Sequence, residues 1–474
     1  MQKIEIADFK RGLNTNDAAH AIEPDQAAEL LNVDVRRKGR VFTRNGKTSL
    51  HSGSALPGTQ VNGATYFKNA SLHICAVTTF IYKIVEGTAT VVRSALTSGA
   101  QVHFATWNTK LWIANGAETP SYFDGSSTWT NPATPPAEWT TVKPNYICEH
   151  ENRLWTLTAA SSQLHWCALD NAEDWTTADN AGSHQFAPND GWGGVGIVSQ
   201  KSGLVVFKNY SIYKVTGKTP VSFQFPNLYN DIGCCAPRSI VNIENKIFFL
   251  SRNKGEYIVY ILDDSGTLTP ISQDIAPTLA AITTNVAAAV SYKGKYILSF
   301  FTTGSTYKTV SYNYRTNSWE HGSGDACSCY YTVDDALYGG RPAIDGNTPS
   351  VYTVDTGTND ADTAITSYVK TRNYLLEGAD YTKQLRYLIV WVKASGAWNM
   401  DINIYIDDKA DTTTLKVPLG PRYTGETTKR EVIPINVDTQ GNMIAIKFGT
   451  STINQPFELY RAELYYDIAQ PEIR

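Results

Sequence analysis

The sequence predicts an all-β fold, a β-propeller of about seven four-stranded blades followed by a C-terminal β-sandwich. The 474-residue chain is poor in charged residues (18%) and rich in tyrosine (27 residues) and tryptophan (11 residues). Aromatic and β-branched side chains suit the pleated, half-buried surface of a sheet. In addition, a strand–turn–strand unit recurs along the chain at roughly the 40–50-residue spacing that is typical of propeller blades.

The recurring unit is a short polar turn between two apolar runs. The stretches LVVFKNYSIYKVTG (204–217) and YFKNASLHICAVTTFIYKI (66–84) share an aromatic-Lys-Asn corner, an apolar run and Ile-Tyr-Lys. Seven such turns align along the chain, at Lys68-Asn69, Asn108-Thr109, Glu151-Asn152, Lys201-Ser202-Gly203, Glu244-Asn245, Lys293-Gly294 and Asp334-Asp335. One apolar run precedes each turn, two follow it, and several units add a shorter fourth, which predicts four-stranded blades packed radially. Six or eight blades are alternatives, and a sandwich would show part of the same pattern.

Residues 1–50 lie outside the repeat and form an N-terminal arm. The segment EPDQAAELLN predicts a short helix, with Pro24 at a first helical position and Asn32 at the end. The segment VDVRRKGRVFTRNG then predicts a hairpin that turns at Lys38-Gly39. We expect this hairpin to supply a strand that closes the propeller ring, which occupies residues 51–360.

Residues 361–474 show longer strands with cleaner alternation of apolar and polar residues. The strands run from ITSYVKTRNYLL (365–376) to FELYRAELYYDI (457–468). Seven or so strands within about 110 residues are typical of a β-sandwich. We therefore expect a separate C-terminal sandwich domain.

The net charge and the lengths of the apolar runs limit which partners the protein can have. The formal net charge is −4 and the isoelectric point is about 6.1, which argues against a broad nucleic-acid-binding surface but not against a channel that DNA passes through. The first twelve residues lack the apolar segment of a signal peptide, and runs such as YLIVWV (387–392) are too short to span a bilayer. We expect a soluble protein made in a cytoplasm, with its seven cysteines as free thiols.

No pattern in the sequence predicts a catalytic, cofactor-binding or metal site. The pairs Cys234-Cys235 and Cys327/Cys329 lack the spacing of a zinc site. Paired carboxylates would suit glycoside hydrolysis, but each acidic pair lies beside a turn, where aspartate is favoured for its local hydrogen bonds. These pairs are Asp263-Asp264, Asp334-Asp335 and Asp407-Asp408.

The one candidate contact site is a basic run in the predicted N-terminal hairpin. It consists of Arg36, Arg37, Lys38 and Arg40. These side chains could contact DNA phosphates or an acidic neighbouring protein, because phosphate contacts are made mostly by arginine and lysine. A solvated hairpin tip is the alternative interpretation.

Several phrases near the N-terminus carry a resemblance to a known family. The segment from Asp8 to Leu50 contains F-x-x-G-L-N, then P-x-x-A-x-x-L-x-N-V-D, then G-x-V-x-x-R-x-G, and HENRLW (150–155) and DIGCCAPRSIV follow later. With the propeller-then-sandwich plan, these phrases resemble the tail hub, or nozzle, proteins of short-tailed double-stranded DNA bacteriophages, also called packaged-DNA stabilisation proteins.

The resemblance implies a structural virion protein without a cofactor. In that family several copies, usually six, form a ring below the portal and adaptor. The ring continues the DNA channel, helps to retain the packaged genome and docks a needle, spike or fibre. We accordingly expect a homohexamer in the virion tail, synthesised in the bacterial host cytoplasm, that lets DNA pass without sequence-specific binding.

Two other classes of function compete with this interpretation. The chain could be a propeller glycoside hydrolase or lyase with a carbohydrate-binding sandwich, in which Trp107, Trp112, Trp155 and Trp166 would stack on sugars. It could also be a cellular interaction scaffold similar to kelch or WD-repeat proteins. Those families repeat signature residues in nearly every blade, however, and this chain does not.

Overall fold

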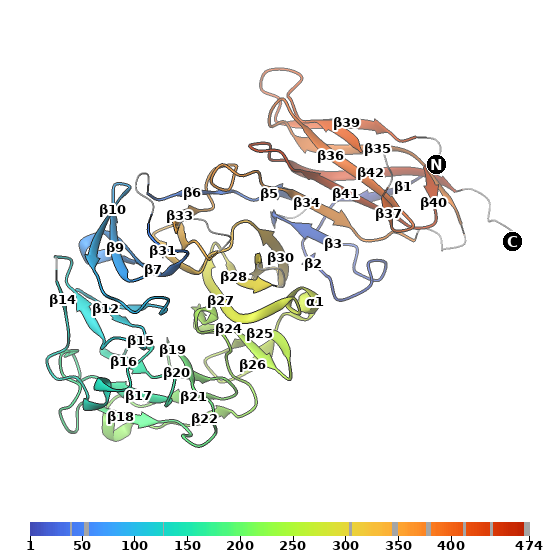
Figure 1. The fold of residues 1–474 in the computed structure, drawn as a ribbon. Helices are drawn as coiled ribbons and strands as arrows, with labels where there is room; N and C mark the ends of the chain where they lie inside the picture. Colours follow the sequence, from blue (N-terminus) through green and yellow to red (C-terminus); the bar gives the residue numbers. More distant parts are fainter. Residues whose placement is uncertain are drawn as a thin grey trace.

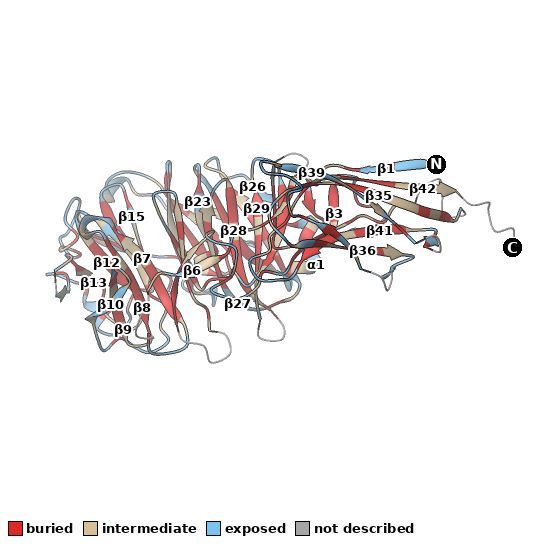
Figure 2. Ribbon diagram, turned by 90° about the horizontal axis from the view of Figure 1, so that it is seen from above, coloured by how far each residue is buried: buried red, intermediate tan, exposed pale blue. Residues whose placement is uncertain are grey.

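The computed structural model describes residues 1–37, 40–51, 56–126, 128–302, 306–343, 349–375, 381–410, 414–436 and 439–468, without the side chains of residues 36 and 37. A ring of small sheets forms one end of the elongated molecule, and the C-terminal strands together with part of the N-terminal segment form the other (Figures 1 and 2). The all-β prediction is confirmed. Helix in the described residues comprises α1 (Ala276–Leu279) and the 3-10 turns η1 (Lys68–Ala70), η2 (Ala137–Thr140), η3 (Pro220–Ser222), η4 (Pro237–Ser239) and η5 (Gln273–Ile275).

The ring is a β-propeller in which six separate four-stranded sheets are blades. Five of them follow the chain order within the described residues: β7–β10 (Val61–Phe67, Leu72–Val77, Phe80–Val85, Thr88–Arg93), β11–β14 (His103–Trp107, Lys110–Ala114, Ser121–Phe123, Trp129–Thr130), β15–β18 (Tyr146–His150, Arg153–Leu157, Gln163–Trp166, Gly182–Gln185), β19–β22 (Gly194–Gln200, Gly203–Lys208, Ile212–Val215, Asn227–Tyr229) and β23–β26 (Val241–Ile243, Lys246–Asn253, Glu256–Leu262, Leu268–Pro270). The sixth combines β31–β33 (Cys329–Val333, Ala336–Gly340, Val351–Val354) with β6 (Lys47–Ser49).

A further antiparallel unit, β27–β30, lies between two of these blades. Its strand β27 contacts β23 on one side and β31 on the other. The four strands are Ile282–Tyr292, Lys295–Thr302, Thr306–Asn313 and Ser318–Ser323. Unlike the six separate blades, this unit continues into an eleven-stranded sheet through β2.

All seven turns predicted from the sequence join the first and second strands of these units. At Asn108 and Thr109 the φ angles are 44° and 64°, and at Glu244 and Asn245 they are 50° and 65°. Positive φ at both central residues gives the turn whose twist matches that of the flanking strands. Asparagine and aspartate tolerate this conformation, which is why these turns are visible in the sequence.

Neighbouring blades pack face to face through apolar side chains. Between the first two blades, the fully buried Phe67 and Leu111 belong to one cluster with Phe123, and the rings of Phe67 and Phe123 lie 6.2 Å apart. Figure 2 shows buried residues along the strands throughout the ring. A single four-stranded sheet cannot bury both of its faces, and radial packing against the next blade solves this problem.

The N-terminal arm contributes strands to both ends of the molecule. It contains β1 (Gln2–Ile6), β2 (Gly12–Leu13), β3 (Gln26–Leu31), β4 (Val33–Arg37), β5 (Arg40–Thr43) and β6. The predicted hairpin is observed as β4–β5, with Arg37 paired to Arg40. The expectation that the hairpin itself closes the ring was wrong, because β5 pairs with β42 (Glu458–Ile468) in another sheet. The strand that completes the last blade is β6, which follows the hairpin.

The predicted helix at residues 23–32 was also wrong, because the structure places strand β3 there. This strand pairs in parallel with β2 and antiparallel with β34 (Ser367–Thr371). Its Ala27 and Leu30 are at most 2% exposed. Helix propensity is a weak preference, and pairing with β2 and with the distant β34 outweighs the helix-forming tendency of Ala, Glu and Leu.

The C-terminal strands form two facing sheets. They are β34, β35 (Lys383–Lys393), β36 (Asn399–Ile406), β37 (Lys409–Ala410), β38 (Leu415–Pro418), β39 (Thr428–Pro434), β40 (Gln440–Gly441), β41 (Ile444–Thr450) and β42. One sheet has seven strands, in the order β39-β35-β42-β5-β4 with β1 and β40 at its sides. The other is the eleven-stranded sheet, in the order β27-β28-β29-β30-β2-β3-β34-β41-β36-β37 with β38 beside β36.

A continuous apolar core joins the propeller to the C-terminal sheets. It includes Leu388 and Ile446 from the two facing sheets, and Phe248 and Tyr296 from the propeller end. The strands of the arm bridge the same boundary, since β2 and β3 lie between β30 and β34. Because the two ends share a sheet and an apolar core, they form one packed unit.

Candidate functional site: a charged junction at the N-terminal arm

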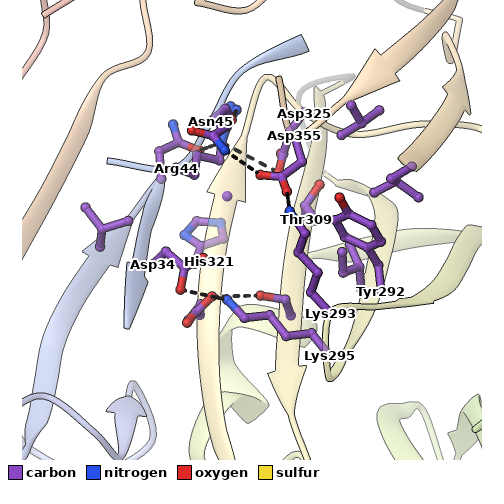
Figure 3. Close-up of a pocket in the computed structure, with 18 residues that line it drawn as sticks. Asp34, Arg44, Asn45, Tyr292, Lys293, Lys295, Thr309, His321, Asp325 and Asp355 are labelled. Carbon is purple, nitrogen blue, oxygen red and sulfur yellow. Dashed lines mark hydrogen bonds and ion pairs between the residues drawn. The ribbon is translucent and has the colours of Figure 1, made fainter. Parts of the chain in front are cut away.

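A pocket of charged side chains lies where the arm meets β27–β30 and the last blade (Figure 3). The cavity has a volume of about 90 Å³. Its walls come from β4 and the residues after β5, from strands β28–β30, and from the segment after β33. The charged residues that line it, together with His321, are Asp34, Arg44, Lys293, Lys295, Glu320, Asp325 and Asp355.

Lys295 is the centre of the more deeply buried half of the junction. Its Nζ lies 3.2 Å from Asp34 Oδ1 and donates a hydrogen bond to Glu320. None of the three side chains is more than 7% exposed. Glu320 also accepts from the Val35 N–H (3.0 Å) and the Ser311 hydroxyl (3.1 Å). The cluster therefore fastens the hairpin strand β4 to the β28–β30 sheet through paired, hydrogen-bonded charges, as buried ions require.

Arg44 forms the second half of the junction. Its guanidinium donates two hydrogen bonds to the carboxylate of Asp360, at 2.9 and 2.6 Å, and Nε donates to Asn32 Oδ1 at 2.9 Å. A further bond of 2.8 Å reaches the Ser323 carbonyl. Burial disfavours the charged form, but the carboxylates of Asp325 and Asp360 outweigh it, so the pKa of Arg44 lies above its ordinary value. Such a fork-to-carboxylate pair fixes orientation as well as distance.

The remaining members of the junction are a histidine and an exposed ion pair. Burial, together with the nearby Lys308, lowers the pKa of His321 to about 4, so the ring is neutral at pH 7. Lys293 Nζ lies 2.6 Å from Asp355 Oδ2 near the rim, where the lysine is 42% exposed. Within the described part of the chain, no three His, Cys, Asp or Glu side chains are placed to hold a metal ion. The junction instead attaches the arm to the rest of the chain through ion pairs.

The basic run predicted from the sequence is not part of this junction. The side chains of Arg36 and Arg37, and all of Lys38, lie outside the described residues. Arg40, in β5, lies 3.4 Å from Glu458 Oε1 and stacks over the ring of Tyr460 at 4.8 Å. Arg40 thus contacts β42 of the C-terminal end, and its contact with DNA or a partner stays a prediction.

Three of the four tryptophans considered as sugar-stacking residues pack inside the propeller, and Trp107 is half-buried against the core cluster that holds Trp112. Trp112, Trp155 and Trp166 are at most 6% exposed, and the tilted rings of Trp155 and Trp166 lie 5.4 Å apart. A ring that binds a sugar face must be open to solvent, and these three are not. The cysteines are free, and burial raises the pKa of the Cys234 thiol to about 12.

Sequence reasoning did not single out the residues of the junction. Asp34 and Arg44 lie within the N-V-D and G-x-V-x-x-R-x-G phrases of the arm, which is the signal that could have marked them. Nothing local marks Lys295 or Glu320, because each is separated from its arm partner by more than half of the chain.

The fold is that of a β-propeller, and its charged junction attaches the N-terminal arm to the rest of the chain. The family model described as "Bacteriophage P22 Gp10, beta-propeller" matches residues 28–295. Because this match spans more than half of the chain, the protein belongs to this family of bacteriophage structural proteins. The resemblance seen in the sequence is confirmed at this level.

Other comparisons add little on function. No curated protein matches the chain. Similar solved structures include YCF48 bound to D1 peptide (10% identity, TM-score 0.41, 66% of this chain and 98% of that one) and the AfRom2 CNH domain (11%, 0.43, 65% and 99%). An exo-β-1,3-galactanase from Phanerochaete chrysosporium also matches (10%, 0.28, 82% and 99%). Likenesses this weak carry no argument for an enzyme. No helix in the described residues has the length and apolarity needed to cross a membrane.

Proposed function

We propose that the protein is a subunit of the tail hub, or nozzle, of a short-tailed bacteriophage. About six copies would form a closed ring below the portal and adaptor, as symmetric assemblies of one chain commonly do. The observation that carries this proposal is the family match, which covers residues 28–50 of the arm together with the larger part of the propeller. The ring would continue the DNA channel, help to retain the packaged genome and dock a needle, spike or fibre.

The architecture that we propose has seven blades and a C-terminal sandwich. In it, β27–β30 serves as a blade, a role supported by its contacts with β23 and β31 on either side. The two facing sheets that share the Leu388 and Ile446 core would form the sandwich of residues 361–474. The propeller would occupy residues 51–360, and residues 1–50 would contribute strands to both parts.

The proposed mechanism is steric and electrostatic. A subunit whose two ends share an apolar core is suited to keep a channel at fixed width. With a formal charge of −4 per chain, a ring of such subunits would not attract the phosphate backbone through its net charge, so DNA would slide past. The basic run of the arm would be a local exception to this negative charge, placed to contact DNA phosphates or an acidic neighbouring subunit. It consists of Arg36, Arg37, Lys38 and Arg40.

A reconstruction of the intact virion tests the proposal. We expect density for this chain on the tail axis, in about six copies, between the adaptor and the distal tail parts. A tail axis in which this chain is absent would overturn the proposal. As a separate check on the glycoside hydrolase alternative, the purified protein is incubated with host-surface polysaccharide, and we expect no release of reducing ends.

A further inference from the structure

A second cavity, of about 330 Å³, lies among the innermost strands of the propeller. Residues of β7, β11, β19, β27 and β31 line it, together with the 3-10 turn η4. Polar side chains that face it include Thr65, His103, Arg238 and Tyr330. With about 30 Å³ for each water in the liquid, this volume has room for on the order of ten water molecules or for a partly hydrated small solute.

Arg238 reaches across this cavity from η4 to three other sheets. Its Nη1 donates to the carbonyl of Ser328 (2.9 Å), and its Nη2 donates to the carbonyls of Val102 (3.3 Å) and Asn62. These acceptors belong to β7 and to the residues that lead into β11 and β31. The guanidinium therefore holds three inner strands together, and every one of its protein acceptors is a neutral carbonyl.

The positive charge of Arg238 has no carboxylate partner among the described residues that line the cavity. Burial lowers its pKa, and the groups that act on it electrostatically are the Cys329 thiol and the Tyr146 phenol, both neutral at pH 7. Three buried lysines of the protein, in contrast, have a carboxylate partner. Lys208, Lys295 and Lys429 each have a carboxylate oxygen within 3.2 Å of Nζ, from Asp190, Asp34 and Glu431 respectively. Arg238 is partly buried, and a charge that is removed from water is costly unless an opposite charge compensates it.

We propose that the central cavity binds a small inorganic oxyanion, such as phosphate or sulfate, against the guanidinium of Arg238. The planar fork of donors on arginine matches the oxygens of such an anion. His103 lines the same cavity and packs edge-on against Tyr146, with the ring centres 4.9 Å apart. Burial and the charge of Arg238 lower the pKa of His103 to about 3, so at pH 7 it is a neutral ring that offers one N–H donor.

The bound anion would stabilise the closed ring. It would neutralise the charge that holds β7, β11 and β31 together, so these strands would be joined by an ion pair at the axis as well as by hydrogen bonds. Binding to the folded state alone raises stability in proportion to the logarithm of ligand concentration. This inference concerns the propeller itself and does not depend on the role of the protein in the virion.

Thermal unfolding and calorimetric titration of the full chain with inorganic phosphate test the proposal, with sodium chloride of equal ionic strength as the reference. The variants are Arg238→Gln and the matched control Arg153→Gln. Arg153 is buried and, like Arg238, bonded to carbonyls, those of Cys167 and Asn180, but it lies outside this cavity. We expect phosphate to raise the unfolding temperature of the wild type and of R153Q, and the phosphate affinity of R238Q to fall about tenfold or more. The proposal would be overturned if phosphate left the unfolding temperature of the wild type unchanged. It would also be overturned if phosphate bound R238Q and R153Q with equal affinity.

A second measurement uses the wild type alone, because R238Q loses three inter-blade bonds and its folding is at risk. Crystals of the wild-type chain are soaked in selenate, whose selenium gives an anomalous signal. We expect a peak within hydrogen-bond distance of the Arg238 guanidinium. An unoccupied cavity at saturating selenate would contradict the proposed anion site at Arg238. Anomalous peaks confined to surface lysines would contradict it as well.

Discussion

Lys295 joins two carboxylates that come from opposite halves of the chain. Its partners Asp34 and Glu320 lie on β4 and β30, and all three side chains are nearly inaccessible to solvent. Substituting Lys295→Met would leave two buried carboxylates without a cation. We expect the free energy of unfolding to fall by about 3 to 5 kcal/mol, as when one partner of a buried ion pair is removed. Chemical denaturation of the purified protein measures this change.

Lys293→Met is the matched control for this substitution. Lys293 lies two residues before Lys295 and pairs with Asp355, but it is 42% exposed. Exposed ion pairs contribute about 0 to 1 kcal/mol, so we expect a correspondingly small change. Equal losses in the two variants would show that burial of the Lys295 cluster does not matter.

His321 makes the stability of the junction depend on pH. Its pKa of about 4 in the folded protein lies below the value of about 6.5 that a histidine has in an unfolded chain. Between these values the unfolded chain binds more protons, so stability is fully present above about pH 6.5 and is lost as the pH falls towards 4. We expect His321→Gln to make the unfolding free energy less steep in this window. Parallel pH profiles for the variant and the wild type would rule out this role.

The residues of the junction show why a site of this kind escapes prediction from one sequence. Asp34 and Arg44 lie in phrases that were recognised, yet no local pattern indicates that a charge on the arm meets Lys295 or Asp360. The contact depends on the register of strands such as β4 and β5, and register is a property of the assembled sheet. The basic run was visible because its four charges are adjacent in sequence.

At the scale of elements, β6 is the strand that closes the last blade. Just after it, the Leu50 N–H donates to the Val351 carbonyl at 2.8 Å, and the Leu50 side chain packs partly buried against the core that holds Val61. Leu50→Pro removes this donor, whereas Leu50→Ala keeps it and loses only packing. We expect L50P to be less stable than L50A by about 1 to 3 kcal/mol, because a carbonyl loses its partner. Matching denaturation midpoints for L50P and L50A would mean that this closing bond contributes nothing.

Elements that depend on local sequence could be predicted, whereas elements that depend on pairing with another strand could not. Hairpin turns such as Asn108-Thr109 and Asp334-Asp335 have local signatures, because few residues tolerate positive φ. The segment 26–31 has the composition of a helix, but its conformation is decided by β2 and β34. Closure by β6 likewise depends on a partner strand some 300 residues away, as the pairing of Thr48 with Thr353 shows.

At the scale of the whole molecule, the two chain ends hold each other in one sheet. Residues Gln2–Ile6 of β1 pair with Ala462–Tyr466 of β42. The same arm supplies β2 and β3 to the eleven-stranded sheet and β6 to the propeller. Both ends of the elongated molecule in Figure 1 are thus joined through the first fifty residues. This construction favours a subunit that moves as one body, which the proposed ring around a DNA channel would require.

The count of this chain in purified virions, measured by quantitative mass spectrometry against the portal subunit, tests the central claim most directly. A six-fold hub below a twelve-fold portal predicts about one copy for every two portal subunits. About three copies per particle would instead indicate a trimeric spike or needle. Absence of the chain from the particle would contradict the account, since a hub subunit must be part of the mature tail.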